Sequence, residues 1–265
     1  MKNTVLSPVK MFGHKLPKNG IQHLIVFGDS LSDNGFDNVH GFQRYSNGKV
    51  WPEYLAKNMA FRTLDVRAWG GATSGMGNYR RKANEWSGLL WQIQNYAPVT
   101  DMESTLVVIE IGTNDLHDPS MNISPSQVVN NLSNGLKQLN SKRVKHIILW
   151  NLNSNIEFPG YIDKEYLQFD YYNTQHELAK KSFEDVNKLI DELICHFNAN
   201  QKELNIALFD VNSFIKDIST QFENITTPWL DTDCYPKKMG WLWFDHWHFM
   251  TETHSYIADH LFESL

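Results

Sequence analysis

Cysteine is almost absent from this chain. Only Cys195 and Cys234 occur among 265 residues, and their spacing matches no zinc-binding or disulfide framework. Cys195 falls on the apolar side of a helical pattern, which predicts a small buried side chain. Cys234 lies in a loop-like stretch, so a bridge between the two sulfurs remains open but has no support from the spacing.

Long apolar runs and clusters of positive charge are also missing. No stretch reaches about 18 apolar residues, and the N-terminus carries Lys2 but no apolar segment of about 7–15 residues. Lysine and arginine are scattered over a chain of net charge −6, so no basic stripe can neutralise a phosphate backbone. We therefore expect a soluble protein with no transmembrane segment and no nucleic-acid partner. It is expected to be cytoplasmic, or exported without a recognisable signal peptide.

Nucleotide-binding glycine motifs are absent as well. The glycine-rich segment 70–77 does not follow the G-x-G-x-x-G dinucleotide pattern, and no Walker lysine comes after it. Its glycines allow close approach of the backbone and can leave an N–H group exposed. A flexible loop is the ordinary alternative for such a segment.

Short apolar runs alternate with amphipathic segments, and 42% of the residues are hydrophobic, enough to bury a core. The runs predict strands at residues 24–26, 63–69, 106–111, 146–150 and 206–209. Periodicity and capping signals predict helices at residues 51–59, 89–96, 125–142, 171–200, near 213, and 252–262. This order predicts an α/β fold, a three-layer α/β/α sandwich with a mainly parallel sheet of about five strands. Residues 1–20 are expected to form an N-terminal arm and residues 21–265 a single domain.

Three of the predicted strands end in polar loops. Ser30 follows the first strand within the segment 28–31, Gly71 follows the second, and Asn114 follows the third. Loops at the carboxyl ends of strands carry the chemistry of open α/β sheets, so Ser30 is a candidate nucleophile. The backbone N–H of Gly71 and the amide of Asn114 are candidate donors to an oxyanion. The alternative is that these residues only form turns, because Gly, Asp, Ser and Asn are the commonest residues in turns.

The segment 243–248, Trp-Phe-Asp-His-Trp-His, contains the groups that a nucleophilic serine requires. A hydroxyl needs a base to take its proton, and the base needs a carboxylate to fix its tautomer. Asp245 and His248, three residues apart, can supply both. A second interpretation is a metal site of Asp245, His246 and His248, because His-x-His on an extended segment directs both rings to one side. That site would leave Ser30 unexplained.

At these positions the sequence resembles the GDSL esterases and lipases, also called SGNH hydrolases. Gly-Asp-Ser-Leu at 28–31 is similar to their first block, and Gly71 in Gly-Gly-Ala-Thr-Ser to their second. Gly-Thr-Asn-Asp at 112–115 is similar to the third block, and Asp-His-Trp-His at 245–248 to the closing Asp-x-x-His. With Trp-Pro-Glu-Tyr-Leu at 51–55, the extended first block most resembles the bacterial thermolabile-haemolysin and phospholipase-like branch, which includes lysophospholipases and acyltransferases.

The resemblance implies a carboxylic ester hydrolase that works through an acyl-enzyme. In that scheme Ser30 is the nucleophile, His248 the general base and acid, and Asp245 the carboxylate that orients it. The oxyanion hole consists of the N–H groups of Ser30 and Gly71 and the side chain of Asn114. No metal and no other cofactor is implied.

Two residues near the four blocks differ from the usual pattern of the family. Phe249 follows the histidine where many relatives have proline, and Asn-Leu-Asn at 151–153 stands where Asn-Leu-Pro is usual. Both departures can alter the substrate pocket without touching a catalytic group. Asp29 is expected to make a turn or helix-cap hydrogen bond. Ser32 and Ser74 are rival nucleophiles only if the block assignment is wrong.

The resemblance favours a small-molecule or lipid ester as substrate, such as a lysophospholipid, with acyl transfer to another alcohol as a further activity. Trp243 and Trp247 are expected to line an acyl groove or to contact a lipid surface transiently. The alternative substrate is a short-chain acetyl ester of a carbohydrate, since the wider family includes such esterases. A non-catalytic binding module that keeps the fold is the alternative of another class.

Overall fold

The computed structural model describes residues 16, 20–35, 44–98, 101–201, 204–231 and 239–265. Its centre is a five-stranded sheet in the order β2-β1-β3-β4-β5, in which every neighbouring pair is parallel. The strands are β1 (His23–Gly28), β2 (Thr63–Val66), β3 (Thr105–Glu110), β4 (His146–Trp150) and β5 (Asn205–Phe209). The predicted N-terminal arm, apart from residues 16 and 20, and the predicted loop position of Cys234 lie outside the described residues.

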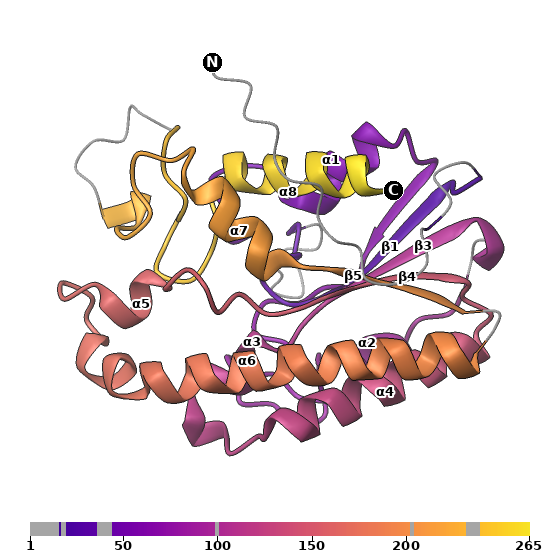
Figure 1. The fold of residues 1–265 in the computed structure, drawn as a ribbon, viewed down its shortest axis with the longest axis horizontal. Helices are drawn as coiled ribbons and strands as arrows, with labels where there is room; N and C mark the ends of the chain where they lie inside the picture. The colour runs from indigo at the N-terminus through magenta and orange to yellow at the C-terminus, as the bar shows by residue number, and fades with distance from the viewer. Residues whose placement is uncertain (1–15, 17–19, 36–43, 99–100, 202–203, 232–238) are drawn as a thin grey trace.

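Helices cover both faces of the sheet (Figure 1). One face carries α1 (Trp51–Asn58), α7 (Val211–Ser219) and α8 (Thr251–Ser264), and the other carries α2 (Leu89–Gln94), α4 (Pro125–Ser141) and α6 (Phe169–Asn200). Shorter elements are α3 (Thr113–Leu116), α5 (Pro159–Ile162) and the 3₁₀ helices η2 (Met102–Ser104), η3 (Pro119–Met121) and η4 (Trp229–Asp231). The predicted three-layer α/β/α sandwich is confirmed. None of the described helices is both long and apolar enough to cross a membrane.

Burial on both faces explains the composition of the central strands. All six residues of β3 and five of the six residues of β1 are buried. Parallel strands covered on both sides read as nearly continuous apolar runs, and each fully buried aliphatic side chain stabilises the fold by about 1.5–3 kcal/mol. The predicted second strand is shorter than expected, because β2 ends at Val66. Beyond it, the N–H groups of Arg67 and Trp69 still bond to carbonyls of β1 at 2.7 and 3.1 Å.

The long helix α6 buries the apolar stripe that its periodicity predicts, namely Phe183, Val186, Ile190, Leu193 and Phe197. The predicted burial of Cys195 is wrong, however, because its thiol is exposed and free. Ile194 is still buried in the core. One residue further along a helix turns the side chain by about 100°, which carries Cys195 past the edge of the buried stripe.

The strand order determines where chemistry can occur. In a sheet of order 2-1-3-4-5, ligands bind in the crevice at the carboxyl ends of the strands, where the chain changes direction between β1 and β3. Ser30 leaves the end of β1, and Asn114 lies in α3 directly after β3. The first and third predicted loops therefore flank this crevice.

Candidate active site

Ser30, His248 and Asp245 form a continuous chain of hydrogen-bonding groups. The Ser30 Oγ lies 2.8 Å from His248 Nε2, and His248 Nδ1 lies 2.8 Å from each carboxylate oxygen of Asp245. Ser30 follows β1, whereas His248 precedes α8, 218 residues later. The fold thus brings a hydroxyl, a base and a carboxylate to the separations that proton transfer requires.

A tight turn holds Asp245 and His248 together. Asp245 Oδ1 accepts the backbone N–H of Trp247 at 2.8 Å and of His248 at 2.9 Å. An aspartate that bonds the backbone two residues ahead closes a turn of its own. Burial opposes ionisation of Asp245, but the charge and the hydrogen bonds of His248 outweigh it and hold the pKa of Asp245 below its ordinary value. The ionised carboxylate can therefore stabilise a protonated imidazole.

Tyr45 is a residue of this site that the sequence reasoning missed. Its ring stacks on the His248 ring, with centroids 4.6 Å apart and an interplanar angle of 23°. Its hydroxyl is hydrogen-bonded to the guanidinium of Arg80. The stacking limits rotation of the imidazole, and Arg80 places a positive charge beside the cavity. The one signal in the sequence was an aromatic residue in a polar loop, which says nothing of where its ring will lie.

Ser30 and Gly71 line the same cavity, and neither N–H group has a hydrogen-bond acceptor among the described residues. Gly71 has φ +82°, and a Cβ there would come within 2.7 Å of Asn78 Oδ1 and of the Arg80 side chain. Only glycine fits this conformation and this space. Two unpaired backbone donors at one cavity are the arrangement that a developing oxyanion needs.

Asn114 lines the cavity as well, but its amide is already engaged. Its Nδ2 donates to Asp29 Oδ2 at 3.1 Å and to the Ala72 carbonyl at 3.0 Å. A reacting carbonyl would have to share one of these two hydrogens. The fold therefore brings Asn114 to the cavity, but the hydrogens of its amide are already bonded to Asp29 and to the Ala72 carbonyl.

Asp29 is buried beside Ser30 and does more than close a turn. Its Oδ1 accepts the N–H of Leu31 at 3.0 Å, which confirms the predicted local bond. Its carboxyl also interacts with that of Glu110, the last residue of β3, and the two influence each other's pKa. Burial raises the pKa of Asp29 well above its ordinary value, and the charge of Glu110 raises it further. Because burial also raises the pKa of Glu110 to about 7, the pair holds a proton under mildly acidic conditions.

The rival serines are not available for attack. Ser32 is fully buried and its hydroxyl donates to Glu110 at 2.8 Å. Ser74 is fully buried and donates to Asp115 at 2.6 Å. Neither hydroxyl reaches solvent or the cavity, whereas Ser30 does.

A cavity of about 400 Å³ opens at Ser30 and His248. Much of its wall is aromatic and consists of Tyr45, Tyr79, His117, Tyr166, Tyr172 and Trp247. Burial lowers the pKa of His117 to about 4, so this ring is neutral at physiological pH and acts as a flat, weakly polar surface. The volume lies in the range of small-molecule sites, about 300–1,000 Å³.

The two tryptophans assigned to the substrate differ in position. Trp247 lines the cavity. Trp243 does not: it is fully buried, stacks on Phe249 with centroids 4.7 Å apart, and donates its indole N–H to the Ile225 carbonyl at 2.9 Å. The predicted substrate contact of Trp243 is therefore wrong, because this side chain belongs to the core beneath the site. Alternation along the segment 243–248 could not tell which tryptophan faces inward.

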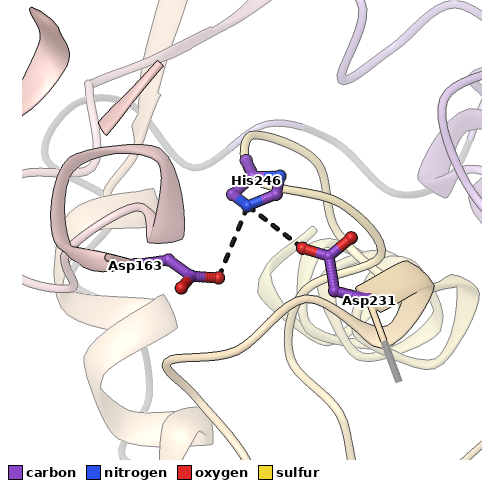
Figure 2. Close-up of side chains that lie close together, drawn as sticks. All are labelled: Asp163, Asp231 and His246. Atoms are coloured by element: carbon purple, nitrogen blue, oxygen red, sulfur yellow. Dashed lines mark ion pairs between the residues drawn. The ribbon is translucent and has the colours of Figure 1, made fainter. Parts of the chain in front are cut away.

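The alternative metal site of Asp245, His246 and His248 is not assembled. His248 uses both ring nitrogens for Asp245 and Ser30. The Nε2 of His246 instead faces carboxylates of two other segments, Asp163 and Asp231, at 3.4 and 3.1 Å (Figure 2). The two histidines therefore serve separate clusters.

Comparison with known proteins gives relatives of similar sequence and of similar fold. The thermolabile hemolysin of Vibrio parahaemolyticus is 24% identical to this chain over 286 residues, covering 92% of this chain and 64% of that protein. The chain thus spans less than two thirds of the length of this relative. Among solved structures, a carbohydrate acetylesterase family member from Sinorhizobium meliloti superimposes with a TM-score of 0.55 at 15% identity, over 92% of this chain and 96% of the other. An acetyl xylan esterase gives a TM-score of 0.52 at 16% identity, over 92% and 99%.

At such identities the solved structures show a shared fold and no more. The family match is more specific, because the model of the GDSL-like lipases and acylhydrolases aligns with residues 24–261. That span begins in β1 before Ser30 and ends in α8 after His248. The chain therefore belongs to the GDSL-like lipase and acylhydrolase family.

Proposed function

We propose that the protein is a serine-dependent carboxylic ester hydrolase that works through an acyl-enzyme, with Ser30 as nucleophile, His248 as general base and acid, and Asp245 as the carboxylate that orients it. The observation that carries this proposal is the chain of 2.8 Å contacts from Ser30 Oγ through both nitrogens of His248 to Asp245. Family membership supports the reaction class.

Each step uses a group in that chain. His248 Nε2 takes the Ser30 proton while Oγ attacks the ester carbonyl, and Asp245 stabilises the imidazolium that forms. The N–H groups of Ser30 and Gly71 and one Asn114 hydrogen receive the negative oxygen. His248 then returns the proton to the leaving alcohol, and an acyl-enzyme remains. Attack by water, activated by the same imidazole, releases the acid; attack by another alcohol would make the enzyme an acyltransferase.

For the substrate, we favour a single-chain lipid ester of the lysophospholipid type. The aromatic wall of the cavity offers apolar contact to an acyl chain, and Trp247 stands one residue before the base. Arg80, on the same wall, can pair with an anionic group of the alcohol part. The similarity to a thermolabile hemolysin is consistent with a lipid substrate.

The same cavity also supports a second candidate, a short-chain acetyl ester of a carbohydrate. Tyr79, Tyr166 and Tyr172 add hydroxyls, and Gln168 adds an amide, to a volume of only about 400 Å³. Polar groups beside aromatic faces suit the hydroxyls and rings of a sugar as well as an acyl chain.

Hydrolysis of a graded series of acyl esters distinguishes the two candidates. Each buried methylene contributes about 0.8 kcal/mol, so an acyl groove predicts that kcat/KM rises severalfold for each two carbons until the groove is full. A preference for acetyl or butyryl over decanoyl esters, measured below their aggregation thresholds, would favour the carbohydrate candidate. Ser30→Ala should lose hydrolysis of every ester in the series; activity that survives at the wild-type level would refute Ser30 as the nucleophile.

A further inference from the structure

A second cluster of ligand-type side chains lies behind the catalytic turn. Asp163 caps the end of α5, Asp231 ends η4, and His246 stands next to Asp245 (Figure 2). One potential ligand atom from each of the three lies within 4.8 Å of the others. Three chain segments distant in sequence thus converge on one point.

One polar atom at this point lacks a hydrogen bond within the described part of the chain. His246 Nε2 is buried and has no hydrogen-bond partner among the described residues, although two carboxylate oxygens stand 3.1 and 3.4 Å away. Neither Asp163 nor Asp231 is paired with a lysine or arginine in the described part of the chain. Two carboxylates beside an imidazole are a donor set that suits a cation, and the unpartnered Nε2 can serve as one of its ligands.

Two of the three ligand separations match the coordination shell of a small divalent ion. For metal–ligand bonds of about 2.1 Å, neighbouring ligands lie roughly 3.0 Å apart in an octahedral shell and roughly 3.4 Å apart in a tetrahedral one. The two Nε2–oxygen separations, 3.1 and 3.4 Å, fall within that range. Asp231 is 45% exposed, so water can complete the shell and the ion can exchange with solvent.

The protein scaffold also holds two of the three ligands, His246 and Asp163, in place. The Tyr166 ring stacks on His246 with centroids 3.8 Å apart, and the His246 carbonyl accepts the N–H of Gly160 at 3.0 Å. Asp163 Oδ1 accepts the N–H of Glu165 at 3.0 Å, which turns Oδ2 toward the imidazole. Ligands fixed in this way lose little conformational freedom when an ion binds.

We propose that Asp163, Asp231 and His246 bind one divalent transition-metal ion, with Zn²⁺ preferred. A mixed set of one imidazole and two carboxylates suits Zn²⁺ and, more weakly, Mn²⁺, whereas Ca²⁺ and Mg²⁺ favour oxygen ligands alone. The ion would not touch the reacting atoms. It would fasten α5 and η4 to the turn that carries Asp245 and His248, as a positioning and stabilising site.

Metal binding to the full chain tests this proposal independently of ester hydrolysis. Protein stripped with a chelating resin is dialysed against micromolar Zn²⁺ at neutral pH, and bound metal is counted by mass spectrometry. We expect one ion per chain and a rise in Tm of roughly 5 °C when Zn²⁺ is about a hundredfold above its Kd. Asp231→Asn and His246→Gln should each weaken binding at least about tenfold and abolish the rise in Tm.

Exposed Cys195 and His196 on α6 provide the matched control, because a neighbouring thiol and imidazole can capture zinc adventitiously. The Cys195→Ser/His196→Gln double variant should still bind one ion. Binding that is lost in this control would overturn the proposal, as would no binding by the wild type, or binding unchanged in Asp231→Asn and His246→Gln. If the three side chains form only an ion pair, Asp231→Asn and His246→Gln lose the same stability with and without Zn²⁺. That result would also overturn the proposal. Asp231→Asn is isosteric and half-exposed, so its far-UV circular dichroism should match the wild type.

Discussion

Asp29 and Glu110 illustrate how single residues tune the site without entering the chemistry. Asp29 connects three features: the turn after β1 through Leu31, the amide of Asn114, and the carboxyl of Glu110. Asp245, on the other side of Ser30, is held in its ionised form. The environment therefore keeps Asp245, the hydrogen-bond partner of His248, ionised, whereas the Asp29–Glu110 pair beside Asn114, the proposed oxyanion donor, holds a proton.

The Glu110→Gln variant tests the protonated pair. The unfolded chain ionises Glu110 near its ordinary pKa of 4.5, whereas burial holds the folded pKa at about 7. The folded state then binds more protons, so this group's stabilisation is complete below pH 4.5 and is lost as the pH rises toward 7. Glutamine has no proton to lose, so the stability of Glu110→Gln relative to wild type should improve across this window, by roughly 3 kcal/mol at most. Urea unfolding at several pH values measures the difference; a constant difference would show that folding does not raise the pKa of Glu110.

At the scale of elements, α5 acts as the support of the catalytic turn. Its Gly160 donates its N–H to the His246 carbonyl at 3.0 Å. The indole of Trp247 packs directly on the glycine, so that an added Cβ would overlap the ring. A four-residue helix thereby fixes the two residues that lie between Asp245 and His248.

Gly160→Ala should therefore disturb catalysis from outside the cavity. The added methyl displaces Trp247 and with it His248, so we expect kcat/KM to fall roughly tenfold or more, with a loss of stability of about 1–3 kcal/mol. Gly75→Ala is the matched control, since a Cβ there meets its nearest neighbour at an ordinary 3.4 Å. Equal activity in both variants, assayed on the same ester, would mean that α5 does not position the turn.

The elements also show what sequence can and cannot predict. The strands β1, β3, β4 and β5 were predicted correctly because each is a short, nearly continuous apolar run, and α6 because its helical period is sustained over many turns. α3 and α5, with four residues each, are too short to display a period. Ser30 and His248 could be proposed from the sequence because their blocks resemble those of the GDSL esterases. The contacts of Tyr45 and Glu110 at the site could not be predicted, and the exposure of Trp243 and Cys195 was predicted wrongly. Both depend on tertiary packing, which no local sequence pattern encodes.

At the scale of the whole molecule, buried histidines set the acid limit of stability. His254 in α8 is fully buried, and neither of its ring nitrogens has a hydrogen-bond partner among the described residues. Burial lowers its pKa to about 3, with the charges of His248 and Arg44 acting in the same direction. The folded protein therefore holds this ring neutral where the unfolded chain protonates it.

His254→Leu should be more acid-stable than the wild type. Because the folded pKa lies below the unfolded value of 6.5, the stabilisation from His254 is present above pH 6.5 and is lost as the pH falls toward 3. Leucine is similar in size and takes up no proton, so the Tm difference in favour of the variant should grow as the pH falls through this range. Thermal unfolding followed by circular dichroism gives the comparison. A difference that does not change with pH would place the acid sensitivity elsewhere.

The central claim is that Ser30 is the nucleophile, and covalent labelling by a serine-directed fluorophosphonate, read by intact mass and peptide mapping, tests it most directly. Wild type should gain one label per chain, on the peptide that contains Ser30. Ser30→Ala should gain none, whereas Ser74→Ala should be labelled as the wild type is, because Ser74 is buried and engaged by Asp115. Labelling that persists in a correctly folded Ser30→Ala protein, or that maps to another serine in the wild type, would contradict the account.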